Sequence, residues 1–255
     1  MSFRAAALGG IFALAIGVVA GCGSSPAPAT APPGGGKTVD AATAGTLTGR
    51  VVFKGTPPAR ETFKMGTDPV CGASGQSEAL LVSKDGAIQN AFVYIKDGVD
   101  PSYTFDVPTT PVTLDQKGCF YEPRVVGVRV GQPIQIVNSD PTLHNVHALP
   151  RVNQEFNYPQ SKVGASMTRT FTSPEVMVRF KCDVHGWMAS YVGVMSTPFF
   201  AVTNSDGSFE IKGLPPGTYT VEAWQEKLGT RSATITIGPS QSQTTSFTFE
   251  ETKSQ

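Results

Sequence analysis

Cys182, His185 and Met188 follow one another at three-residue spacing. Their side chains offer a thiolate, an imidazole and a thioether. Soft sulfur ligands favour Cu(I), and imidazole binds copper well; two imidazoles, a thiolate and a weak axial thioether form the copper site of blue-copper electron-transfer centres. The segment therefore predicts three of the four ligands of such a copper site. The ligand that it does not supply is the second imidazole.

Two predicted strands decide which histidine completes the site. The chain contains three histidines, His144, His147 and His185. Alternation along residues 176–182 places Cys182 on the apolar face of its strand, so its thiol points inward. On the other strand, His144 shares its face with a valine, whereas His147 falls on the opposite face. We therefore predict His144 as the second imidazole ligand and place His147 outside the site.

These residues, in this order, resemble the cupredoxin family. The resemblance is carried by three stretches, Asn138-Ser139-Asp140, His144-Asn145-Val146 and residues 182–188. The short spacing from His185 to Met188 is most similar to that of amicyanins. The resemblance implies one type 1 copper ion with the equatorial ligands His144, Cys182 and His185 and the axial ligand Met188. It also implies that Asn145 braces the loop after Cys182 by a hydrogen bond.

The function that this resemblance implies is electron transfer. A thiolate site framed by strands changes its geometry little between Cu(II) and Cu(I). We expect electrons to pass through an exposed edge of His185, beside which Trp187 either lines a docking patch or packs the loop. The expected partner is a redox protein such as a cytochrome or a dehydrogenase.

Two other functions are compatible with the same residues. One is a copper storage or delivery protein, which needs exchangeable metal. The other is a non-redox lipoprotein with a ligand-binding or structural role. An enzyme is not expected, because copper enzymes of this architecture need further imidazoles and only His147 is left over.

The N-terminal residues resemble a bacterial lipoprotein signal. Arg4 precedes an apolar run from Ala5 to Ala20 that is too short to span a membrane comfortably. Small residues then precede Cys22 as in a lipobox, which implies cleavage after residues 1–21 and lipid on Cys22. An ordinary secretory signal with an incidental cysteine is the alternative. The resemblance implies a protein in the cell envelope, lipid-anchored to a bacterial membrane on its periplasmic or extracellular face.

The two remaining cysteines are predicted to form a disulfide. Cys22 is assigned to lipid and Cys182 to metal, which leaves Cys71 and Cys119. Spare cysteines in an oxidising compartment usually pair. A second metal site is the alternative, but no histidine flanks either cysteine. We therefore interpret residues 68–72 as the loop that presents Cys71 to its partner.

The composition indicates an extracytoplasmic β-protein. Among 255 residues, 27 are glycine and 20 proline, and the 20 basic residues balance the 20 acidic ones. No global charge favours a nucleic-acid partner. Short strands separated by turns predict β-sandwiches, with at most a short helical turn near residues 151–165.

Changes of pattern divide the chain into five segments. These are a signal peptide (1–21), a lipidated cysteine with a disordered linker (22–44), a β-rich region (45–109), a cupredoxin-like copper domain (110–198) and a C-terminal β-sandwich (199–251). Residues 203–221 resemble the carboxypeptidase regulatory-like (transthyretin-like) sandwich. That family usually begins with a strand like residues 45–51. Two alternatives are open: region 45–109 completes the C-terminal sandwich, or it extends the copper domain. The predicted fold class is all-β, with a cupredoxin-like Greek-key β-sandwich and a smaller transthyretin-like β-sandwich.

Overall fold

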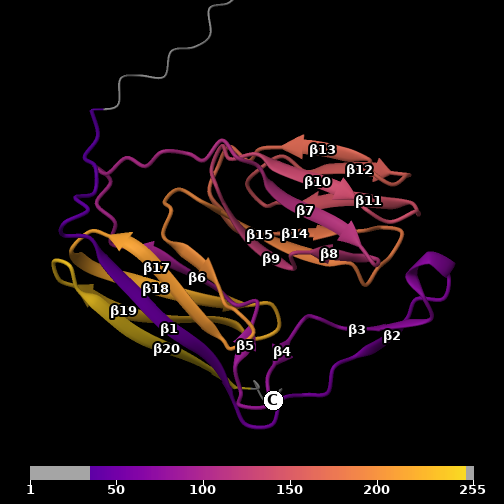
Figure 1. Cartoon of the computed structure of the whole chain (residues 1–255), viewed down its shortest axis with the longest axis horizontal. Coiled ribbons are helices and arrows are strands. Elements are labelled where there is room, and N and C mark those ends of the chain that lie inside the picture. The colour runs from indigo at the N-terminus through magenta and orange to yellow at the C-terminus, as the bar shows by residue number, and fades with distance from the viewer. Residues whose placement is uncertain (1–34, 251–255) are drawn as a thin grey trace, which may run out of the picture. The chain divides into compact units, whose positions relative to one another are not determined.

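The computed structural model describes residues 35–250, whose regular structure is almost entirely β (Figure 1). The single helical element in this range is the 3₁₀ turn η1 (Pro69–Cys71). The turn expected near residues 151–165 is instead partly a strand, because residues 156–160 pair with a neighbouring strand. None of the described helices has the length and apolar character needed to cross a membrane. The predicted signal peptide, Cys22 and most of the linker lie outside the described residues.

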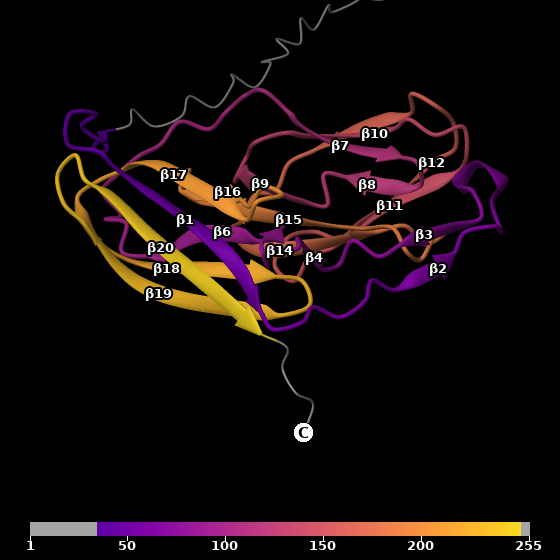
Figure 2. The ribbon, with the colours of Figure 1, turned by 60° about the horizontal axis from the view of Figure 1, so that its bottom comes forward.

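Seven strands form the C-terminal sandwich. Its sheets have the orders β17-β1-β20 and β16-β6-β18-β19. The strands are β1 (Gly45–Lys54), β6 (Phe92–Asp97), β16 (Phe200–Val202), β17 (Ser208–Leu214), β18 (Gly217–Gln225), β19 (Gly229–Ile237) and β20 (Ser242–Glu250). Buried and less buried residues alternate along β1, which runs parallel to β20 and antiparallel to β17 (Figure 2). Its buried side chains join those of the facing sheet in one core.

Nine strands form the other sandwich, which carries the predicted metal ligands. Its sheets have the orders β13-β10-β7-β8 and β12-β11-β14-β15-β9. The strands are β7 (Val112–Lys117), β8 (Phe120–Glu122), β9 (Val125–Arg129), β10 (Ile134–Asn138), β11 (His144–Leu149), β12 (Phe156–Gln160), β13 (Ser166–Arg169), β14 (Glu175–Lys181) and β15 (Ala189–Met195). The pairs β7–β10 and β9–β15 are parallel, so the chain crosses between sheets as in Greek-key sandwiches. The predicted all-β fold of two sandwiches is confirmed.

Region 45–109 is shared between the two sandwiches. Its first strand, β1, and β6 belong to the C-terminal sandwich. The short strands β4 (Leu81–Val82) and β5 (Ile88–Gln89) pair with each other. Residues 62–76, here called the cap, contain the strands β2 (Thr62–Lys64) and β3 (Ser74–Gln76) with η1 between them. The cap packs on the nine-stranded sandwich, where Phe63 contacts Phe120 and Trp187 at ring-centroid distances of 6.2 and 5.9 Å.

The last residues of the predicted linker form backbone hydrogen bonds. The Lys37 amide donates to the Ser102 carbonyl at 2.8 Å, and the Ala44 amide donates to the Asp40 carbonyl at 2.9 Å. The end of the linker therefore makes defined contacts ahead of β1.

Two glycines allow close packing between the sandwiches. Gly127 of β9 pairs with Gly193 of β15. A Cβ atom would lie 2.3 Å from the Phe200 ring at Gly127 and 2.5 Å from the Phe92 ring at Gly193. Phe92 and Phe200 themselves stack at 5.7 Å. The absence of side chains at these positions therefore makes room for two aromatic rings of the C-terminal sandwich.

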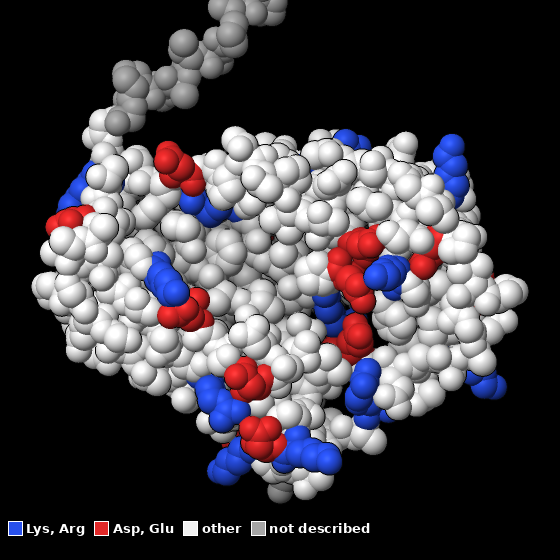
Figure 3. Space-filling model, in the orientation of Figure 1, with Lys and Arg blue, Asp and Glu red and all other residues white. Residues whose placement is uncertain are grey.

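Charged side chains are sparse on the face shown in Figure 3, where acidic and basic residues lie in small mixed groups. One ion pair is nearly buried: the Arg124 guanidinium binds Glu226 with two hydrogen bonds of 2.9 Å. Their side chains are 7% and 13% exposed. Because Arg124 precedes β9 and Glu226 follows β18, this pair also joins the two sandwiches.

Candidate metal centre

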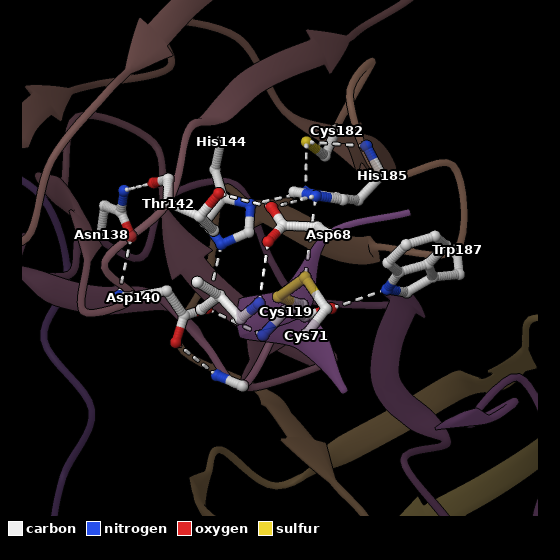
Figure 4. Close-up of a disulfide and its surroundings, with 12 residues drawn as sticks. Asp68, Cys71, Cys119, Asn138, Asp140, Thr142, His144, Cys182, His185 and Trp187 are labelled. Atoms are coloured by element: carbon white, nitrogen blue, oxygen red, sulfur yellow. Dashed lines mark hydrogen bonds and ion pairs between the residues drawn. A yellow bond between two sulfur atoms is a disulfide. The ribbon is translucent and has the colours of Figure 1, made fainter. Parts of the chain in front are cut away.

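Three predicted ligands converge in the core of the nine-stranded sandwich (Figure 4). His144 is the first residue of β11, Cys182 directly follows β14, and His185 lies on the loop between β14 and β15. The two Nδ1 atoms of the histidines are 2.9 Å apart, and Cys182 Sγ is 3.8 Å from His185 Nδ1. One ligand atom from each residue lies within 4.8 Å of the others, and all three residues are at most 2% exposed.

The sheet and the loop fix these positions. Strands β11 and β14 are antiparallel neighbours, which brings His144 beside the end of the strand that leads to Cys182. The loop is closed by hydrogen bonds from the Cys182 amide to the Met188 carbonyl (3.4 Å) and from the Met188 amide to the His185 carbonyl (2.9 Å). Cys182 Sγ accepts hydrogen bonds from the amides of Asn145 (3.5 Å) and His185 (3.4 Å).

Met188 lies in the same core as Cys182. Its side chain is fully buried, and both residues belong to the hydrophobic cluster between the two sheets. The residue directly precedes β15. Its axial role stays a prediction that this placement supports.

Asn145 links the two segments that carry the predicted ligands. Its Oδ1 accepts a hydrogen bond from the Asp183 amide, and its Nδ2 donates to the Asp183 carboxylate at 3.1 Å. Lys181 and the side chains of Asn145, Asn157 and His147 lower the pKa of Asp183 well below its usual value. The side chain of Asn145 thus binds the loop after Cys182 to β11, through the backbone amide and the ionised carboxylate of Asp183. The resemblance implies a hydrogen bond of this kind.

His147 points away from the three converging ligands. Its Nδ1 lies 2.9 Å from Asp183 and its Nε2 lies 2.8 Å from Glu155, and its side chain is 15% exposed. Both ring nitrogens therefore have carboxylate partners at the surface of the sandwich. Strand parity separates it from His144 as the sequence indicates.

The expectation that His185 has an exposed edge is wrong. The residue is 2% exposed, and its Nε2 lies 3.2 Å from Asp68 Oδ2 and 3.7 Å from Cys71 Sγ. Both covering residues belong to the cap. The correction has a simple cause: the cap lies more than 100 residues before His185 in the chain, and local sequence patterns do not reveal which surface it covers.

The predicted disulfide is confirmed. Cys71 and Cys119 are joined, with their Cα atoms 5.4 Å apart. Cys119 lies in the turn between β7 and β8, so the bond fastens the cap to the sandwich beside the candidate site. Residues 68–72 present Cys71 as predicted and also deliver a carboxylate to His185.

Two carboxylates at the site were not predicted. Asp140 Oδ2 lies 2.9 Å from His144 Nε2, and Asp68 Oδ2 contacts His185. Asp140 precedes His144 by four residues. Its place in the turn before β11 was a signal from which its contact with His144 could have been predicted. Asp68 is 117 residues from His185, and only the disulfide three residues later pointed toward this part of the fold.

The donor set fits a copper ion. Two imidazole nitrogens and a cysteine sulfur converge in a buried core, and Met188 belongs to the same hydrophobic cluster as the cysteine. Type 1 copper uses this combination of residue types. Burial lowers the pKa of His144, which favours the neutral imidazole that a metal ligand requires. The two amides that donate to Cys182 Sγ suit a sulfur that carries negative charge.

Residues 192–250 match the family model of the carboxypeptidase regulatory-like domain. This range contains β16–β20, which form much of the C-terminal sandwich. No curated protein matches the chain.

Several solved structures resemble part of the chain. A purple cupredoxin from Nitrosopumilus maritimus is 20% identical, with 33% of this chain and 99% of that chain covered and a TM-score of 0.29. A point mutant of amicyanin with Cu(I) is 21% identical, with 40% and 98% covered and a TM-score of 0.31. A copper-containing nitrite reductase from Thermus scotoductus SA-01 is 22% identical, with 40% and 26% covered and a TM-score of 0.33. The chain thus spans about a quarter of that enzyme's length.

Proposed function

We propose that the protein binds one copper ion and transfers single electrons between redox proteins. The proposed ligands are His144, Cys182 and His185, with Met188 in the axial position. The observation that carries the proposal is the convergence of two Nδ1 atoms and one thiol in a buried, hydrogen-bonded frame. A bound copper ion would supply the one-electron couple.

The surrounding residues suit electron transfer because they restrict motion and exclude water. His144 and Cys182 are anchored at strand ends, and the loop that carries His185 is closed by backbone hydrogen bonds. A frame that holds its ligands in one arrangement minimises the rearrangement that accompanies a change of metal charge. The protein's contribution would therefore be a preorganised, dry site.

Because the cap covers His185, we propose that electrons enter and leave near Trp187. The Trp187 ring lies 5.1 Å from the His185 ring, and it stacks on Phe63 of the cap. Both aromatic residues are partly exposed. They connect the buried imidazole with the surface on which a cytochrome or dehydrogenase would dock.

Variants of two residues test the proposal. We expect the purified protein to bind one equivalent of Cu(II) with strong visible absorption and a narrow hyperfine splitting in the EPR spectrum. Cys182→Ser should abolish both signals, because it removes the thiolate. His147→Ala is the matched control and should retain both signals, since His147 lies outside the site. A colourless protein with an ordinary tetragonal EPR spectrum would contradict the proposal.

We further propose that the protein is a lipoprotein of the cell envelope, tethered through Cys22. The support is the sequence of residues 1–22 alone. Expression with a labelled fatty acid should yield a labelled, membrane-associated protein, and Cys22→Ala should remove the label. An unlabelled wild-type protein would contradict the anchor without affecting the copper proposal.

A further inference from the structure

The Nε2 atoms of both proposed histidine ligands face carboxylates (Figure 4). His144 Nε2 lies 2.9 Å from Asp140 Oδ2, and His185 Nε2 lies 3.2 Å from Asp68 Oδ2. The carboxylate side chains are only 9% and 18% exposed. An ionised carboxylate only accepts hydrogen bonds, so each Nε2 must donate. A neutral imidazole has a single N–H group, so a ring that donates from Nε2 has an unprotonated Nδ1.

Both carboxylates are themselves fixed. Asp140 accepts hydrogen bonds of 2.8 Å from the amides of Gly118 and Cys119. These two residues have φ of 61° and 60° and form the two-residue turn between β7 and β8. Asp140 therefore cannot rotate away from His144 without losing two backbone donors.

Asp68 is held in an equivalent way from the opposite side. Its Oδ1 accepts a hydrogen bond of 2.9 Å from the Val70 amide, and its Oδ2 accepts one from the Thr142 hydroxyl. These two hydrogen bonds hold the carboxylate of Asp68 with its Oδ2 facing His185. Thr142 lies in the turn that precedes His144, and it thus ties Asp68 to both histidines.

In this arrangement the lone pairs of the two Nδ1 atoms point toward the same position. The Nδ1 atoms are 2.9 Å apart, and when both are acceptors they repel each other unless a cation lies near them. Cys182 Sγ adds a third donor atom on the same side. Two carboxylates behind the imidazoles also add negative charge, which stabilises the more highly charged metal state.

We propose that Asp140 and Asp68 are positioning residues. They hold His144 and His185 with the proton on Nε2 and shift a bound copper ion toward Cu(II). Only the shift toward Cu(II) rests on the copper function proposed above. The position of the proton on Nε2 is a property of the chain itself.

The two carboxylates differ in how they depend on the fold. Asp140 belongs to the sandwich, whereas Asp68 belongs to the cap, which the Cys71–Cys119 disulfide fastens three residues later. Loss of the disulfide should therefore release Asp68 from His185 while the side chain of Asp140 stays on His144. This difference provides an internal control.

The first experiment uses the metal-free protein. Histidine ¹⁵N spectra at constant neutral pH report which ring nitrogen carries the proton. We expect both buried histidines to be protonated on Nε2. Asp68→Ala should alter the His185 signals alone, and Asp140→Ala should alter the His144 signals alone. Asp115→Ala is the matched control, because Asp115 bonds to Ser139 and contacts neither histidine. Cys71→Ser with Cys119→Ser should act like Asp68→Ala.

The second experiment measures the reduction potential of the copper-loaded protein. Asp68→Asn and Asp140→Asn keep a hydrogen-bond acceptor but remove the charge. Each should weaken Cu(II) relative to Cu(I) about tenfold, which raises the potential by about 59 mV. Thr142→Val, which removes one donor to Asp68, should raise it less and serves if an aspartate variant fails to fold.

The outcomes separate the two proposals. Unchanged tautomers and potentials in the aspartate variants would overturn the positioning role. If the reduction potential rises as much in Asp115→Asn as in Asp68→Asn, the effect comes only from the charge of a distant carboxylate. That result would also overturn the positioning role. If the wild-type protein binds no copper, the proposed function fails, while the ¹⁵N spectra still decide the role of the carboxylates.

Discussion

At the scale of single residues, alternation along two strands was enough to choose His144 over His147 as the second predicted imidazole ligand. His144 is buried and His147 is not because β11 is extended, so consecutive side chains point to opposite faces. The same local argument placed Cys182 inward. It could not find Asp68, because no local pattern connects residues 117 positions apart. Sequence reasoning therefore identified the side chains that converge and missed the carboxylates behind them.

Tyr121 offers a residue-scale test of the frame. Its buried hydroxyl donates to the Asn145 carbonyl at 2.7 Å and lies 3.2 Å from the Lys181 carbonyl, so it joins β8 to both ligand-bearing segments. Tyr121→Phe should lower the free energy of unfolding by about 1.5 kcal/mol, since it leaves a buried acceptor unpaired. Urea denaturation of the metal-free protein measures this change. Tyr158→Phe, at an exposed ring, is the control; equal effects of the two variants would refute the argument.

At the scale of elements, the cap was the part least accessible from the sequence. Alternation and turns located most strands, and the cysteine count predicted the disulfide. The surface that the cap covers depends on long-range packing of Phe63 on Phe120 and Trp187. For the same reason the sequence left open that β1 pairs with β17 and β20.

The disulfide should stabilise both the fold and the metal centre. Cys71 and Cys119 are 48 residues apart, and removing such a crosslink costs about 4 kcal/mol on the chain-entropy model. Cys71→Ser with Cys119→Ser should therefore lower the free energy of unfolding by that amount. The same variant should release Cu(I) to a chelator faster, because the cap no longer covers His185. Rapid release from the wild-type protein would instead favour a storage or delivery function.

The C-terminal sandwich contains a buried carboxylate that should make its stability depend on pH. Burial alone raises the pKa of Glu222, but hydrogen bonds from Lys96, Tyr94 and Ser232 outweigh it and lower the pKa below the usual 4.5. Its ionised form therefore stabilises the fold above pH 4.5, and this contribution is lost as the pH falls through the lowered pKa.

We expect Glu222→Gln to lower the free energy of unfolding by about 2 kcal/mol at pH 7. The difference from wild type should shrink as the pH falls below 4.5. Denaturant unfolding of both proteins between pH 7 and pH 3 measures this. A difference that stays constant over this range would exclude the proposed linkage.

At the scale of the whole molecule, the two sandwiches pack through glycines and one nearly buried ion pair. The sequence showed two styles of strand pattern but gave no sign of how closely the sandwiches approach. The contact depends on Gly127 and Gly193 making room for Phe200 and Phe92. Such close approach is a property of paired surfaces, and neither strand reveals it alone.

Gly193→Ala tests this contact. The added methyl would lie 2.5 Å from the Phe92 ring, so side chains must shift, at a cost of about 2 kcal/mol in the free energy of unfolding. Gly66→Ala is the control, because the nearest atom to its added methyl is 3.9 Å away. Thermal or urea denaturation compares the two. Equal stability of both variants would show that the interface tolerates the methyl group.

The central claim is that one copper ion is held by Cys182 and two histidines in a frame that barely changes with oxidation state. X-ray absorption at the copper edge of the loaded protein, oxidised and then reduced, tests it most directly. We predict one short copper–sulfur bond and two nitrogen ligands in both states, with the sulfur bond absent from Cys182→Ser. A shell of nitrogen and oxygen alone, or a ligand set that changes on reduction, would contradict the account.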